Sequence, residues 1–120
     1  MIVPRQVFSH KLQTRHSDLD SNGHVGTQEY FRFCMECAIN ASISGFYHHF
    51  VSNISLFPIL KADITFRGQS VEGKELNILT WQCEHNPAKM YFVIMRDNVR
   101  ITECSFIFWE NKIASVLSKS

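Results

Sequence analysis

The chain has 120 residues, of which 45% are apolar and ten are Phe, so it can bury the core of one globular domain. Twelve Lys and Arg against eleven Asp and Glu leave a formal charge of +1, which offers no overall field for nucleic acid or an anionic membrane. Four Cys, no apolar leader and no run of 18 apolar residues predict a reduced, cytoplasmic protein without a membrane span.

The first half of the chain predicts a strand, a loop and one long helix. Residues 6–15 suggest a modest first strand that ends at an acidic loop. From residue 28 to about residue 47, apolar side chains recur at the spacing of a helix that is buried on one face. These side chains are Tyr30, Phe33, Cys34, Cys37, Ala38 and Ala41. Thr27 is predicted to be the N-cap of this helix.

Four strands are predicted after the helix. In the clearest one, at residues 60–67, Leu60, Ala62, Ile64 and Phe66 alternate with polar residues, as in a half-buried strand. Three more runs, near residues 75–84, 89–95 and 100–109, are separated by turn signals at Asn86-Pro87 and Asp97-Asn98. Their short connections predict an antiparallel meander with the helix packed on its concave face. The predicted fold is α+β, with one domain over residues 1–120.

The acidic loop at residues 18–30, with the sequence DLDSNGHVGTQEY, fits two different structures. It matches the calcium-loop pattern D-x-[DN]-x-[DN]-G-x5-E at every specified position, with Glu29 twelfth. A calcium hand also needs a helix before the loop and normally a second hand, and the sequence indicates neither. We therefore expect no metal here and interpret the segment as an active-site loop that leads into a helix.

The pair Cys34-x-x-Cys37 suggests a redox or zinc site as an alternative to packing. Redox pairs lie at the N-terminus of a helix that follows a strand. Here both Cys fall well inside the predicted helix and on its buried stripe. The sequence therefore predicts that they belong to the core.

A wider motif carries a family resemblance. The run DLDSNGHV at residues 18–25, followed by YFRF at 30–33 and by Glu36, resembles the signature of the 4-hydroxybenzoyl-CoA thioesterase-like hotdog family. The segments at 64–67 and 102–108 look like later strands of that family, so the resemblance covers nearly the whole chain. It implies a hotdog fold, in which one long central helix is wrapped by a five-stranded antiparallel sheet. It also implies a thioesterase that hydrolyses an acyl-CoA or acyl-carrier-protein thioester without a cofactor.

The resemblance also suggests residue roles. Asp20 matches the family's catalytic Asp, as nucleophile or as general base for water, and the positive end of the helix favours its ionised form. Thr27 matches the position whose backbone N–H serves as oxyanion donor. The amides of Gly26 to Gln28 are predicted to be unpaired at the first helical turn. Asp18 is expected to be a structural partner. The family commonly has Asn-Asn at 26–27, so the backbone here must supply the donors.

Further candidates complete the predicted site. Glu36 lies on the helix, where some hotdog enzymes carry their carboxylate, and it is the second catalytic candidate. Arg67 and Lys89 are candidates for binding the phosphates of coenzyme A. The predicted substrate-binding residues are Gly26, Gln28, Tyr30, Arg67 and Lys89.

Two other functions stay open at this stage. A hydratase or dehydratase could use the same fold, but its D-x-N-x-x-H pattern is missed, because Asp20, Asn22 and His24 have one residue too few. A non-catalytic acyl-binding module is compatible with the departure from Asn-Asn at 26–27. In every case we expect a homodimer or homotetramer, because an open sheet of this size has edge strands to cover.

Overall fold

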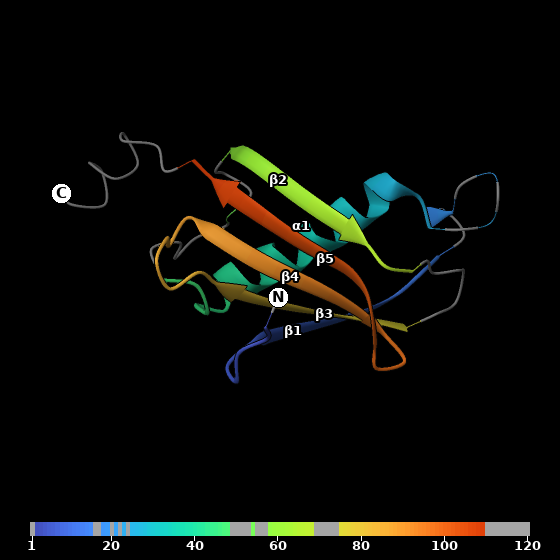
Figure 1. Cartoon of the computed structure of the whole chain (residues 1–120), viewed down its shortest axis with the longest axis horizontal. Coiled ribbons are helices and arrows are strands. Elements are labelled where there is room, and N and C mark those ends of the chain that lie inside the picture. Colours follow the sequence, from blue (N-terminus) through green and yellow to red (C-terminus); the bar gives the residue numbers. More distant parts are fainter. Residues whose placement is uncertain are drawn as a thin grey trace.

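A computed structural model describes residues 2–15, 18–19, 21, 23, 25–48, 54, 58–68 and 75–109. Within these residues, one helix and five strands follow one another in the order β1, α1, β2, β3, β4, β5 (Figure 1). Their bounds are β1 Phe8–Gln13, α1 Thr27–Ile43, β2 Ile59–Phe66, β3 Glu75–Gln82, β4 Lys89–Arg96 and β5 Val99–Phe108. Each predicted element is present, and the strand bounds lie within two residues of the predicted ones.

The strands form one antiparallel sheet in the order β1-β3-β4-β5-β2. The meander is confirmed for β3, β4 and β5, and the turn predicted at Asp97-Asn98 has both residues in the left-handed region. The meander prediction is wrong for β2, which does not lie beside β3 but beside β5, at the edge of the sheet. Eight residues, 67–74, join β2 to β3. They can reach about 27 Å, whereas three strand spacings measure only about 14 Å.

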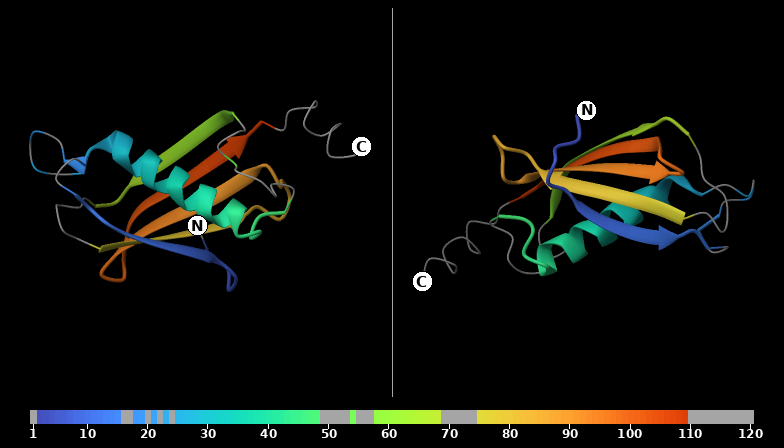
Figure 2. Two further views of the ribbon diagram at one scale, coloured as in Figure 1. Left: turned by 180° about the vertical axis from the view of Figure 1, so that it is seen from behind. Right: turned by 90° about the horizontal axis from the view of Figure 1, so that it is seen from below.

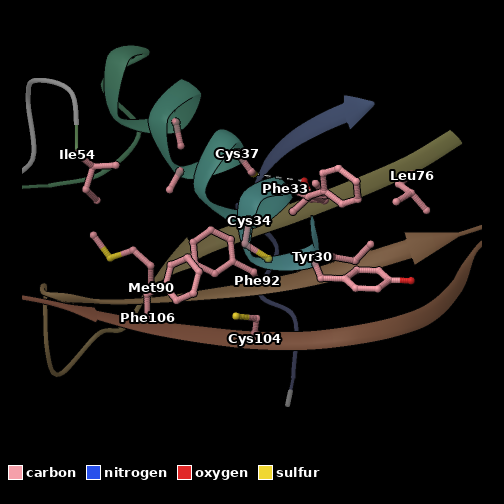
Figure 3. Packing of buried hydrophobic residues seen from close by; sticks show 14 of the residues in the cluster. Tyr30, Phe33, Cys34, Cys37, Ile54, Leu76, Met90, Phe92, Cys104 and Phe106 are labelled. Atoms are coloured by element: carbon pink, nitrogen blue, oxygen red, sulfur yellow. Dashed lines mark hydrogen bonds between the residues drawn. The ribbon is translucent and has the colours of Figure 1, made fainter. Parts of the chain in front are cut away.

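Helix α1 lies diagonally across one face of the sheet and packs on β3 and β1 (Figure 2). The predicted stripe is the buried one: all six of its side chains are at most 2% exposed. They meet side chains of β3, β4 and β5, including Leu76, Phe92 and Phe106 (Figure 3). The helix and one face of the sheet therefore share a single core, as in the predicted hotdog fold.

Both ends of α1 differ from the prediction. Its N-cap is Gly26, and Thr27 is the first helical residue, with no side-chain cap hydrogen bond. The helix ends at Ile43, because Gly45 turns the chain with φ +79°. The N–H of Phe46 then donates to the Ala41 carbonyl at 2.9 Å, and that of Gly45 to Ser42 at 3.1 Å. This is the hydrogen-bond pattern of a Schellman cap.

The cysteine pair is part of the core, as predicted. Cys34 and Cys37 are both fully buried. Burial raises the pKa of the Cys37 thiol to about 12, so it stays protonated and unreactive at neutral pH.

Strand β2 is more exposed than its alternating pattern suggested. It is predicted to be half-buried, yet only Ile64 is partly buried, while Leu60 is 64% and Phe66 43% exposed. The pattern correctly places Ala62, Ile64 and Phe66 on the helix side of the sheet, since they pair with core positions of β5. The helix itself packs on the opposite edge, on β3 and β1, so among the described residues the side chains of β2 are covered only in part.

Candidate functional site at the N-terminus of α1

The loop between β1 and α1 is closed at its base by backbone contacts. The N–H of Asp18 donates to the Arg15 carbonyl at 2.9 Å, and the N–H of Gly26 donates to the Asp18 carbonyl at 3.1 Å. Leu19 and Val25 form an antiparallel bridge. Residues 18–19 and 25–26 therefore bring both ends of the loop to the start of the helix.

The Asp18 carboxylate holds this base together. It is only 3% exposed. One oxygen accepts from the Arg15 N–H at 2.8 Å, and the other accepts from a guanidinium nitrogen of Arg32 at 2.7 Å. A buried carboxylate needs such partners, because an unpaired charge away from water is costly. Asp18 thus has the structural role that was expected for it.

The first turn of α1 offers two backbone donors. The Gly26 amide is not one of them, contrary to the prediction, because it donates to Asp18. Glu29 donates to the Gly26 carbonyl at 3.0 Å. Within the described part of the chain, no acceptor satisfies the N–H groups of Thr27 and Gln28, and both residues are exposed. A pair of free N–H groups at the positive end of a helix is suited to an oxyanion.

An apolar surface adjoins this helix end. We call it the α1–β2 face; it consists of Phe31, Met35, Ile39, Ile64 and Phe66, all of them partly buried or exposed. Tyr30, a predicted substrate contact, is 2% exposed, and its ring packs edge-on against Phe66 at 5.3 Å between centroids. In the single chain Tyr30 is therefore buried beneath the α1–β2 face, in contact with Phe66.

The comparison with known families decides the identity of the fold. The family model of the acyl-ACP thioesterase C-terminal domain matches residues 3–111. The chain belongs to this family. The broader prediction of a hotdog thioesterase family is thereby confirmed, while the narrower 4-hydroxybenzoyl-CoA group stays a prediction. No curated protein matches the chain by sequence.

Solved structures share the fold of this family member at low sequence identity. A gentisyl-coenzyme A thioesterase is 15% identical with a TM-score of 0.72, over 83% of this chain and 84% of that one. A hypothetical protein from Staphylococcus aureus in complex with CoA is 10% identical with a TM-score of 0.70, over 88% and 70%. An acyl-ACP thioesterase from Bacteroides thetaiotaomicron is 16% identical with a TM-score of 0.68, over 91% of this chain but 40% of that one.

Of the two predicted catalytic carboxylates in this thioesterase-family chain, the structure describes only Glu36. Asp20 lies outside the described residues, as do Asn22 and His24. Glu36 is 47% exposed, 3.9 Å from Arg32 and 3.8 Å from Nε2 of His10 on β1. Glu36 is nine residues beyond Thr27, about 13 Å along the helix axis. A base must reach the same substrate atoms as the oxyanion donors, so within one chain Glu36 is badly placed to work with them.

The two predicted phosphate contacts do not meet in one chain. The Arg67 N–H donates to Ile101 at one end of β5, whereas Lys89 pairs with Ile107 near the other end. Six residues of strand separate these points, or about 20 Å. Arg67 contacts Glu103 at 3.3 Å, and the Lys89 ammonium lies 5.2 Å from the centre of the Tyr91 ring. Of the two, Arg67 directly follows the last residue of β2, Phe66, whose ring contacts Tyr30 in the first turn of α1.

A cavity of about 810 Å³ lies at the opposite end of α1. It is bordered by the N-terminal segment, by the chain after the helix and by the β3–β4 hairpin, with Phe46, Trp81 and Tyr91 among its walls. None of the predicted site residues borders it. The cavity is therefore separated by the length of α1 from the Thr27 and Gln28 amides.

Arg32 is the residue that the sequence-based interpretation missed. Its Nε bonds the Glu29 carboxylate at 2.5 Å, in addition to its contact with Asp18. The hydrogen bond with Glu29 raises the pKa of the Arg32 guanidinium. The spacing Glu29–Arg32–Glu36 indicates helix ion pairs, but nothing in the sequence shows that Arg32 also reaches back to Asp18.

The contacts of Arg32 also bear on the calcium alternative. Asp18 and Glu29 would be the first and twelfth ligands of a calcium loop, yet both carboxylates are bound to the same guanidinium. The element before the loop is strand β1 and not a helix. Both observations favour the active-site interpretation.

Across the described residues, no helix is long and apolar enough to cross a bilayer.

Proposed function

We propose that the protein hydrolyses the thioester of an acyl-CoA or an acyl-carrier protein. The observation that carries this proposal is the pair of Thr27 and Gln28 amides at the start of α1, for which the described residues offer no acceptor, in a member of a thioesterase family. They adjoin the loop that contains Asp20 in its sequence and the apolar α1–β2 face. An enzyme that hydrolyses an acyl thioester needs three features: a base or nucleophile, donors for the oxyanion and an apolar surface for the acyl chain.

The proposed reaction uses each feature once. The carbonyl oxygen of the thioester accepts from the Thr27 and Gln28 N–H groups, which stabilise the negative charge that develops on it. Asp20 takes a proton from water while the water oxygen bonds to the carbonyl carbon; alternatively, its carboxylate oxygen attacks first and water then releases the acyl group. The C–S bond breaks, and the leaving thiolate is protonated to give the free thiol.

The substrate panel that tests this proposal should contain aromatic and aliphatic acyl-CoAs and an acyl-carrier protein, in line with the named substrates of the similar structures. We expect release of free thiol, followed with a thiol-reactive dye, at a rate well above that of spontaneous hydrolysis. Hydration of an enoyl-CoA without thiol release would instead indicate the hydratase alternative. Tight binding of acyl-CoA with neither reaction would indicate an acyl-binding module.

We further propose that the protein is a homodimer or a dimer of dimers in which β2 is covered by a second copy. β2 is an edge strand, and Ile59, Leu60 and Phe66 are 40%, 64% and 43% exposed. An open edge with apolar side chains is a surface on which another strand can pair. A second copy at this edge would also cover the α1–β2 face.

Leu60→Lys should weaken this dimer, because it places a charge on the covered edge. We expect the dimer dissociation constant to rise by at least about tenfold, measured by light scattering or sedimentation. Val99→Lys is the matched control, since Val99 is 57% exposed but lies at the β4–β5 turn. A wild-type protein that runs at the single-chain mass of 13.9 kDa at micromolar concentration would contradict the dimer.

A further inference from the structure

Arg32 joins the helix to the base of the loop. Its guanidinium contacts the carboxylates of Asp18 at 2.7 Å, Glu29 at 2.5 Å and Glu36 at 3.9 Å, and it lies 5.0 Å from the centre of the Phe33 ring. Side chains of a helix lean toward its N-terminus, which allows Arg32 to reach back over the first turn. Among these contacts of Arg32, only the one with Asp18 connects α1 to the loop that precedes it.

The contact with Asp18 is also the least screened of the three ion pairs. Asp18 is 3% exposed, whereas Glu29 is 29% and Glu36 is 47% exposed. Exposed ion pairs contribute little, because water screens them. A buried carboxylate that loses one of its partners instead keeps its charge unfavourably or moves toward water. Loss of Arg32 should therefore act mainly on Asp18.

Asp18 in turn fixes both ends of the loop. Its carbonyl accepts from the Gly26 amide, directly before Thr27, and Leu19 bridges to Val25. Asp20 is only two residues from Asp18, at most about 7 Å along the chain. A displacement of Asp18 would therefore also displace Gly26, the residue that precedes the oxyanion amides.

We propose that Arg32 is a positioning residue: by holding Asp18, it fixes the base of the loop and Gly26 relative to the Thr27 and Gln28 amides. This proposal rests on the proposed thioesterase function. A misplacement of about 1 Å at a reacting centre can lower a rate by about 100-fold. The acyl chain binds elsewhere, on the α1–β2 face, so substrate affinity should change much less than turnover.

The test is Arg32→Gln, which keeps most of the aliphatic stem and removes the charged fork. We expect kcat to fall by about 10- to 100-fold with KM changed by less than about threefold. Glu29→Gln is the matched control: it removes the other close partner of Arg32 but leaves the contact with Asp18, and it should keep kcat within about twofold. Arg32→Lys can make only one of the two close contacts, so its kcat should lie between those of the wild type and Arg32→Gln.

A double-mutant cycle separates positioning from general stability. Arg32→Gln and Asp18→Asn should be strongly non-additive in kcat, because each disrupts the same contact. All rates are measured at least 15 °C below the melting temperature of the least stable variant, so that loss of folded protein does not enter. Additive effects, or an Arg32→Gln variant with normal kcat, would overturn the proposal while leaving the thioesterase function in place.

Amide hydrogen exchange tests the same inference without any substrate. Exchange of the Gly26 N–H, which donates to Asp18, should accelerate at least about tenfold in Arg32→Gln. Amides of β4 in the centre of the sheet should be unchanged, and Glu29→Gln should leave Gly26 protected. If the wild type hydrolyses no thioester, the proposed function fails. Unchanged Gly26 exchange would refute the role of Arg32 whether or not the wild type is active.

Discussion

Asp20→Asn should lower kcat by about 10² to 10⁴ while the melting temperature stays nearly the same. The substitution keeps the size of the side chain and its ability to hydrogen-bond in the loop, and it removes the negative oxygen that would attack the thioester or deprotonate water. An amide is neither a useful base nor a nucleophile at neutral pH. KM should change little, because the acyl chain and the carrier bind through other groups.

Two comparisons make the Asp20 result specific. Asp97→Asn is a matched control, since Asp97 lies at the β4–β5 turn with φ +52°, a conformation that Asn adopts readily, and it is not one of the proposed site residues. It should leave kcat unchanged. Glu36→Gln tests the second carboxylate candidate. Normal turnover in Asp20→Asn together with abolished turnover in Glu36→Gln would move the catalytic carboxylate to the helix.

The sequence predicted the elements of the fold because their periodicities are strong. The helical stripe from Tyr30 to Ala41 and the turn at Asp97-Asn98 each follow from local rules, and both are confirmed. The order of strands is not local. A connection of eight residues is long enough to cross the sheet, so the position of β2 beside β5 could not be deduced from its length.

The site was predicted less completely than the fold, because its contacts are also not local in the sequence. The motif indicated a loop that leads into a helix, and the structure has that helix from Thr27. The prediction of unpaired first-turn amides rested on helix geometry alone, which leaves those donors without a partner inside the helix. The occupied amide of Gly26 and the contact between Arg32 and Asp18 depend on how the loop folds back on the helix. The exposure of the apolar side of β2 depends on where the helix packs on the sheet, and the alternating pattern of one strand does not specify that position.

Thr27→Pro should lower kcat by about 10² to 10³, because it deletes one backbone donor from the proposed oxyanion site. Thr27 is the first residue of α1, where proline is well tolerated, since that N–H has no partner within the helix. Gly26 already has φ −68° and ψ 151°, the extended conformation that a residue before proline prefers. The helix should therefore form normally without the amide hydrogen.

Thr27→Ala provides the matched control for the proline variant. It keeps the backbone N–H and removes only the side-chain hydroxyl of a residue that is not the N-cap, so both kcat and stability should stay close to wild type. The informative quantity is the ratio of kcat between the alanine and proline variants, measured with matched melting temperatures and circular dichroism spectra. A ratio near one would show that the Thr27 amide does not hold the thioester oxygen, and the oxyanion site would then have to lie elsewhere than at the start of α1. A large ratio with unchanged KM would place the donor's contribution in the transition state, as an oxyanion contact requires.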